Sequence, residues 1–200
     1  MFTRPAHLSD AAAIVEIYNR EVTSGVATFD MVPRTVAEQT EWLRSHAGAF
    51  PCIVAVDGGA PDGGAPDDGA PDDGAPDDDP VSGWACLSRY RPRPAYSTSV
   101  EDSVYVHPDY QRRGVGDLLL GDLVAAGDNL GFHSVFARIA GEPGGDAAVS
   151  GEASIALHRK HGFELVGVER EVGRKFGRWL DVTLMQRLFV SGEQGGAAAQ

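Results

Sequence analysis

The chain has 200 residues, of which 42% are apolar, and it carries a formal net charge of −12. This composition suits one soluble globular domain with its own hydrophobic core. No apolar run approaches the roughly 20 residues that a membrane helix needs, and residues 1–5 lack the apolar stretch of a signal peptide. We therefore expect a cytoplasmic protein that does not engage membranes.

The negative charge is concentrated in one segment. Residues 57–79 contain nine Asp and neither Lys nor Arg, which leaves 20 acidic and 17 basic residues elsewhere. No basic face stands out, so nucleic acid is not an expected partner. Cys52 and Cys86 lie in apolar runs without a partner at metal-ligand spacing, so we expect buried thiols and no metal site.

The first elements are predicted to be a strand at 2–4 and two helices. Ser9 or Asp10 can cap the first helix, whose apolar residues recur at helical spacing: Ile14, Ile17, Tyr18 and Val22. Thr35 and Glu38 form a capping-box pattern, which predicts that the second helix begins there.

A five-residue repeat of Gly, Ala, Pro and Asp separates two strand-like stretches, 51–56 and 81–87. The repeat has no large apolar residue to bury, so we expect residues 58–80 to form a disordered loop at the tip of a β-hairpin. Its Pro-Asp-Asp-Gly spacing does not match a calcium-binding loop.

The later elements alternate between strands and helices. The pattern predicts strands at 99–106, 132–139, 163–172 and 179–189, and helices at 115–130 and 153–161. The tail 191–200 has little to bury. This order predicts a single α/β domain at 1–190, with a mixed sheet flanked by helices.

The segment 111–116, Gln-Arg-Arg-Gly-Val-Gly, follows a strand and opens a helix. The first N–H groups of a helix have no internal partner, and Gly114 and Gly116 let the backbone approach an anion closely. A Walker A loop would need Lys after the second glycine, and a dinucleotide fingerprint would need glycine where Leu119 stands. A pyrophosphate-binding loop is the remaining phosphate interpretation. The alternative is a Gly-containing helix start with surface arginines.

Several stretches together resemble the phosphinothricin and methionine sulfoximine acetyltransferase branch of the GNAT superfamily: residues 27–29, 33–35, 93–96, 101–106, 111–116, 156–163 and 175–182. The resemblance covers nearly the whole chain outside 57–80 and 140–150. It implies the GNAT acyl-CoA N-acyltransferase fold, with a mostly antiparallel central sheet. It also implies acetyl-CoA as co-substrate, a small amino acid as acceptor, and a homodimer.

The resemblance also implies roles for individual residues. Glu101 matches the general base, and His158 stands where many relatives carry a Tyr that protonates the leaving thiolate. The residues implied to hold acetyl-CoA are Val104, Tyr105, Val106, Gln111, Arg112, Arg113, Gly114, Val115, Gly116 and Ser154. Asp102 should point to the opposite face from Glu101, so we expect only one of the two carboxylates to face the cleft. His158 could instead simply close its helix, and we expect His107 and His161 to be turn and capping residues.

The acceptor site is predicted from a second set of residues. Arg89, Arg91 and Arg93 alternate, and residues two apart on an extended chain share a face, so these side chains could bind a carboxylate. A charged, solvated edge strand is the alternative. The candidates for substrate binding are Phe29, Arg91, Arg93, Tyr96 and Lys175, although Phe29, Tyr96 and Lys175, together with Trp179, also match positions at a dimer contact.

One position departs from the family pattern. Relatives often carry Asn at the start of the last long helix, where Gly151 stands here. This loss could weaken CoA binding, or Ser154 could compensate for it. An acceptor of another kind (a protein N-terminus, a polyamine or an antibiotic) and a non-catalytic acyl-CoA-binding module stay open as alternatives.

Overall fold

The computed structural model describes residues 1–46, 48, 50–58, 80–145 and 150–189. The strands are β1 (Phe2–Pro5), β2 (Cys52–Val56), β3 (Val81–Arg89), β4 (Ser99–Val106), β5 (Ser134–Gly141), β6 (Glu164–Lys175) and β7 (Arg178–Leu188). The α-helices are α1 (Ala11–Thr23), α2 (Val36–His46), α3 (Val115–Asn129) and α4 (Glu152–Lys160). The predicted acidic loop and C-terminal tail lie outside the described residues, apart from Gly58 and Pro80. Within the described part, no helix is long and apolar enough to cross a membrane.

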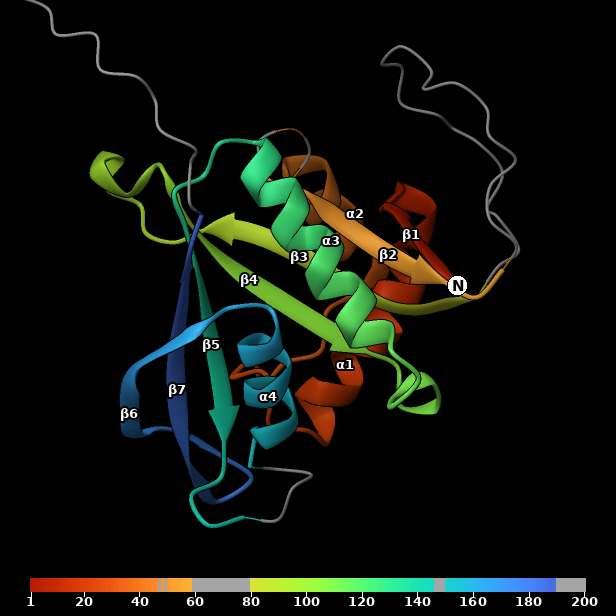
Figure 1. Ribbon diagram of the computed structural model, residues 1–200. Helices are drawn as coiled ribbons and strands as arrows, with labels where there is room; N and C mark the ends of the chain where they lie inside the picture. Colours follow the sequence, from red (N-terminus) through yellow and green to blue (C-terminus); the bar gives the residue numbers. More distant parts are fainter. Residues whose placement is uncertain (47, 49, 59–79, 146–149, 190–200) are drawn as a thin grey trace, which may run out of the picture.

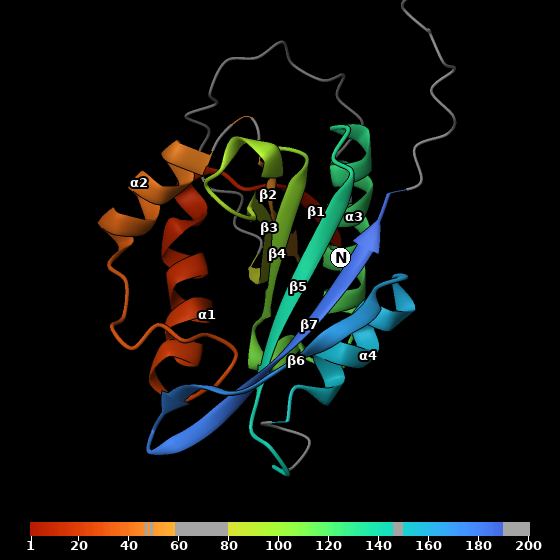
Figure 2. The ribbon, with the colours of Figure 1, turned by 90° about the vertical axis from the view of Figure 1, so that its left-hand side faces the viewer.

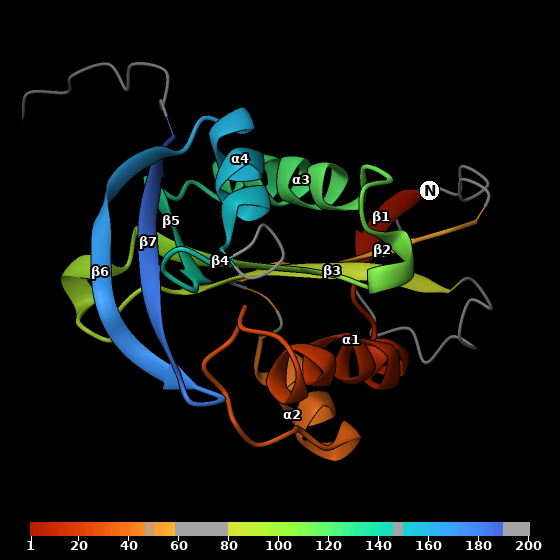
Figure 3. The same cartoon turned by 90° about the horizontal axis from the view of Figure 1, so that it is seen from below.

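The strands form one seven-stranded mixed sheet in the order β1-β2-β3-β4-β5-β7-β6. Every neighbouring pair is antiparallel except β4 and β5, which run parallel. Helices α1 and α2 cover one face, and α3 and α4 cover the other (Figures 1 and 3). The predicted mixed sheet, and the hairpin formed by β2 and β3, are confirmed.

Each face of the sheet has its own apolar core. On the α3 side, Leu119, Leu120 and Leu123 pack with Val100 and Val135 of the two parallel strands. On the α1 side, Ile14, Ile17 and Tyr18 pack with Trp84 and Cys86. Because side chains alternate along a strand, β2, β3 and β4 contribute side chains to both cores.

The parallel strands β4 and β5 separate soon after they pair. Their register covers only Ser99↔Ser134, Val100↔Val135 and Glu101↔Phe136. Beyond these pairs, β4 continues to Val106 beside β3, whereas β5 continues to Gly141 beside β7. The two strands diverge in the ribbon, and Figure 2 shows them between the two helical layers. The sheet therefore opens at its centre.

The helix starts agree only in part with the predicted caps. Thr35 and Glu38 do form the capping box, with Glu38 N donating to Thr35 Oγ1 at 3.2 Å and Thr35 N donating to Glu38 Oε2 at 2.8 Å. Asp10 precedes α1, but its carboxylate instead accepts hydrogen bonds from the Arg4 guanidinium and from His7 N. The expected cap on α1 is therefore wrong, because nearer donors already engage the Asp10 side chain.

Candidate active site at the separation of β4 and β5

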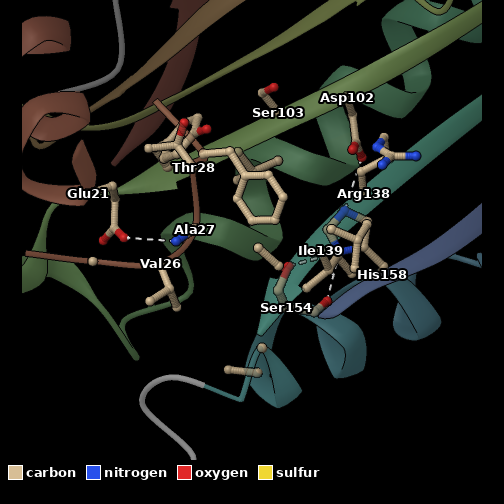
Figure 4. Close-up of a pocket in the computed structure, with 18 of the residues that line it drawn as sticks. Glu21, Val26, Ala27, Thr28, Asp102, Ser103, Arg138, Ile139, Ser154 and His158 are labelled. Carbon is tan, nitrogen blue, oxygen red and sulfur yellow. Dashed lines mark hydrogen bonds and ion pairs between the residues drawn. The ribbon is translucent and has the colours of Figure 1, made fainter. Parts of the chain in front are cut away.

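A cavity of about 660 Å³ lies where β4 and β5 separate. Its wall comes from β4, β5, α4 and the loop after α1, and its charged lining residues are Glu21, Glu101, Asp102, Arg138 and His158. Figure 4 shows residues of all four segments around this space. Because the sheet is open here, one cavity is bordered by side chains from both faces of the sheet.

Glu101 and Asp102 both border this cavity, from opposite faces of β4. Glu101 shares a face with Tyr105, which packs in the α1-side core, and Asp102 shares a face with Val100 on the α3 side. The opposite orientation was predicted correctly. The expectation that only one carboxylate faces the cleft is wrong, because the cavity passes through the sheet.

The environment of Glu101 suits proton uptake. Its side chain is 30% exposed, and a carboxylate oxygen lies 4.0 Å from Arg91 Nη1. Burial raises the pKa of the Glu101 carboxyl, while the charges of Arg138 and Arg91 oppose that rise. A carboxyl group with a raised pKa is a better base for an ammonium group than an ordinary one.

His158 is buried in α4 and has an acceptor at each ring nitrogen. Its Nε2 lies 3.0 Å from Asp102 Oδ2, and its Nδ1 lies 2.7 Å from the carbonyl oxygen of Ser154 (Figure 4). Two acceptors require two N–H donors, which only the imidazolium form provides. Burial disfavours that form, but the hydrogen bond and charge of Asp102 and the Ser154 carbonyl outweigh burial and raise the pKa of His158.

The backbone of β4 presents polar groups to the opening. His107 N donates to Ser82 O, so the odd-numbered residues of β4 direct their N–H and C=O groups toward β3. The backbone groups of Val104 and Val106 therefore face the side of β4 from which β5 has departed. Tyr105 directs its backbone to β3 instead, and its ring stacks on Trp84 with centroids 4.9 Å apart.

The predicted pyrophosphate loop leads into the 15-residue helix α3. Gly114 is its N-cap residue, with φ of 88°, and a Cβ there would meet no atom within 4 Å. The side chains of Gln111, Arg112 and Arg113 are exposed, whereas that of Val115 is buried in the core, so Val115 can offer only its backbone. The N–H groups at the start of α3, the open space at Gly114 and the charges of Arg112 and Arg113 together fit a diphosphate group.

The start of α4 explains the departure at position 151. Gly151 is the N-cap residue with φ of 75°, and a Cβ there would lie 2.9 Å from Ala140 O and 3.0 Å from Ile139 Cγ2. An asparagine would therefore be strained in this backbone. Ser154 does line the cavity, and its Oγ lies 3.3 Å from His158 Nδ1.

Arg91, Arg93 and Tyr96 are not among the residues that line this cavity, although Arg91 contacts the lining residue Glu101. Strand β3 ends at Arg89, and Arg91 and Arg93 follow in a turn before the short 3₁₀ helix Pro94–Tyr96. The expected shared face of the arginines is therefore wrong, because the alternation ends with the strand. Arg91 instead covers the ring of Tyr90, and Tyr96 meets that ring edge-on.

Phe29 lines the cavity, and Lys175 anchors the loop that carries it. The buried Lys175 Nζ donates to Glu21 O at 2.6 Å and to Thr28 O at 2.9 Å. Burial lowers the pKa of Lys175. The structure thus places Lys175 behind the cavity wall, holding the loop between α1 and Phe29.

Glu21, Asp102 and Arg138 are charged lining residues to which the sequence assigned no role. Arg138 interrupts the otherwise apolar run Phe136-Ala137-Arg138-Ile139, and a lone charge in a predicted central strand is the signal that could have identified it. Asp102 carried no such signal, because its partner His158 is 56 positions away in the chain.

The comparisons with known proteins fit this geometry. The model of the Acetyltransferase (GNAT) family matches residues 13–163. The chain belongs to the GNAT acetyltransferase family. Phosphinothricin N-acetyltransferase of Streptomyces coelicolor is 38% identical, over 92% of this chain and 94% of that protein. An L-methionine sulfoximine/L-methionine sulfone acetyltransferase of Pseudomonas paraeruginosa is 34% identical, over 92% of this chain and 91% of that protein.

A solved GNAT structure supports the same fold. The phosphinothricin acetyltransferase of Sinorhizobium meliloti, determined in complex with acetyl-CoA, superimposes with a TM-score of 0.76 at 34% identity. The match covers 98% of this chain and 94% of that one. The predicted GNAT fold and family are therefore confirmed.

Proposed function

We propose that this GNAT chain transfers an acetyl group from acetyl-CoA to the amino group of a small amino acid such as phosphinothricin or methionine sulfoximine. The observation that carries this proposal is the opening between β4 and β5, where Glu101 borders the cavity from one face of the sheet and Asp102 and His158 border it from the other. Relatives named for these two acceptors support the acceptor class.

Acetyl-CoA would bind on the α3 and α4 side. Its diphosphate fits the segment from Gln111 to Gly116, and its pantetheine arm fits along the exposed backbone of Val104 and Val106. One amide on this edge can donate to the thioester oxygen and stabilise the negative charge that develops during attack. Ser154 lines the same side of the cavity.

The acceptor would enter from the α1 side, next to Glu101. An ammonium group is not a nucleophile, so its proton must first pass to a base, and the half-buried Glu101 carboxylate is placed to take it. The amine then attacks the thioester carbon, the C–S bond breaks, and the leaving thiolate needs a proton. His158, which Asp102 holds in the imidazolium form, is the acid that we propose for this step.

The transfer needs no covalent enzyme intermediate, because holding the amine against the thioester already lowers the barrier. Direct transfer in a ternary complex predicts that both substrates must be bound before thiol is released. Acetyl-CoA is made and used inside cells, so this activity fits the predicted cytoplasmic location.

The proposal can be tested by mixing the protein with acetyl-CoA and phosphinothricin, methionine sulfoximine or methionine sulfone. Thiol release should depend on the acceptor, and mass spectrometry should detect the N-acetyl product. Polyamines, an aminoglycoside and a peptide N-terminus serve as competing acceptors. Turnover only with one of these would replace the amino-acid assignment, and CoA binding without transfer to any amine would favour a non-catalytic module.

The predicted homodimer is also part of this proposal. Large apolar side chains are exposed on β6, on β7 and in the turn between them: Leu165, Val166, Val168, Val172, Phe176, Trp179 and Leu188. Exposed apolar residues gathered on an edge hairpin support a protein–protein contact. Sedimentation equilibrium should give twice the monomer mass, and a monomer at all concentrations would contradict this assignment.

A further inference from the structure

We infer that Arg138 is the residue that binds the α-carboxylate of the acceptor, and that it thereby selects amino acids over simple amines. This inference rests on the proposed function and names a specificity determinant for it. Arg138 lies on β5, two residues past Phe136, the last residue paired with β4. It lines the cavity (Figure 4), and its side chain is 25% exposed.

Arg138 and Glu101 lie on the same face of the sheet. Glu101 is paired with Phe136, and Arg138 follows Phe136 by two positions, so all three side chains point toward α1. Among the charged neighbours, Arg138 is the one that most strongly opposes the rise in the pKa of Glu101. The guanidinium therefore acts in the same part of the cavity as the carboxylate that we propose as base.

The charges in the cavity match a zwitterion. Asp102 and His158 neutralise each other on the opposite face. Glu101 and Arg138 then present one negative and one positive group on the acceptor side, where a second carboxylate, Glu21, accepts a hydrogen bond from Ala27 N. Arg138 is the one cation other than His158 among the described lining residues. An α-amino acid carries an ammonium and a carboxylate on the same carbon, so it can satisfy both groups at once. A simple amine can satisfy only Glu101.

Glu169 orients the Arg138 guanidinium but leaves N–H donors of Arg138 free to bind a ligand. The ion pair joins β5 to β6, and the side chain of Glu169 is 44% exposed. The two hydrogen bonds to Glu169 engage only two of the five N–H donors of the guanidinium. A half-exposed ion pair contributes little to stability, so Arg138 can share its charge with a substrate carboxylate at small cost.

The test is equilibrium binding by calorimetry to the protein saturated with CoA, so it does not depend on turnover. The ligands are methionine sulfone and its carboxamide, which differ only in the charge of the group that Arg138 would hold. The wild-type protein should bind the acid about 10- to 100-fold more tightly than the carboxamide. Arg138→Gln should lose that preference by weakening acid binding, while its affinity for the carboxamide changes less than about threefold.

The matched control is Arg178→Gln. Arg178 of β7 also forms an ion pair, with Glu142 just after β5, but it does not line the cavity, so the preference for the acid should persist. Arg138→Lys keeps the charge without the forked geometry and should give an intermediate preference. Equal binding of acid and carboxamide by the wild type, or an unchanged preference in Arg138→Gln, would overturn the inference. A preserved preference for the acid without any acetyl transfer would overturn the proposed function and leave the role of Arg138 standing.

Discussion

Asp102 and His158 join strand β4 to helix α4 through a buried ion pair, with His158 Nε2 3.0 Å from Asp102 Oδ2. Both side chains are only 4% exposed. The pair lies beside the opening where β4 has lost β5 as a neighbour, so a side-chain contact replaces part of the missing backbone ladder. The same contact holds the acid that we propose for the leaving thiolate.

Replacing Asp102 by Asn should destabilise the fold in a pH-dependent way. The pKa of His158 is raised in the folded protein. The stability that its ion pair with Asp102 contributes is therefore complete below the ordinary His pKa of about 6.5, and it is lost as the pH rises through the folded pKa. At about pH 6, Asp102→Asn should cost about 2–4 kcal/mol in the free energy of unfolding, and less at higher pH. Urea unfolding measured across this range checks the result. Asp109→Asn, which changes an exposed carboxylate near His107, is the control.

Glu101→Gln should lower kcat by about 10²- to 10⁴-fold, because glutamine cannot take the ammonium proton. Acetyl-CoA affinity should change little, since Glu101 faces the acceptor side of the cavity. In the wild type, burial raises the pKa of Glu101, so kcat/KM should fall on acidification at a pH above the ordinary glutamate value. Stopped-flow thiol release against pH measures both effects. An unchanged kcat in Glu101→Gln would remove this residue from the mechanism.

Arg112→Glu should weaken acetyl-CoA binding about 10- to 100-fold, because it reverses a charge beside the start of α3. S-acetylpantetheine lacks the diphosphate, so its kcat/KM should be nearly unaffected by the substitution. Arg44→Glu makes the same charge change on the exposed face of α2. It should change neither the binding of acetyl-CoA nor the kcat/KM for S-acetylpantetheine. A parallel loss for acetyl-CoA and S-acetylpantetheine would refute a diphosphate role for Arg112.

Lys175→Met should loosen the loop that carries Phe29. The substitution leaves the Glu21 and Thr28 carbonyls without the ammonium donor, which should cost about 2–3 kcal/mol in unfolding free energy. The KM for the acceptor should rise while the Kd for acetyl-CoA stays constant, because we place the acceptor on the α1 side, where this loop lines the cavity. Thermal unfolding and steady-state kinetics test the two effects separately. A rise in the acetyl-CoA Kd instead would place Lys175 in a different role.

Local sequence patterns determined the secondary-structure elements and the glycine-containing start of α3. The apolar periodicity of α1, the Thr35–Glu38 box and the hairpin around the acidic repeat each depend on residues close together in the chain. The start of α3 is also local, because Gly114 and the following amides suffice to present N–H groups to an anion. These features could be predicted because short-range geometry alone specifies them.

The chemistry within the cavity was decided by tertiary structure. The prediction that Arg89, Arg91 and Arg93 share one face was wrong because β3 ends at Arg89. Residue alternation in the sequence cannot reveal where a strand ends. Asp102 meets His158 where α4 packs beside the opening between β4 and β5, and Arg138 meets Glu169 across the intervening strand β7. The physical reason is that strand alternation specifies which face a side chain occupies, whereas strand pairing and separation determine which distant residues share that face.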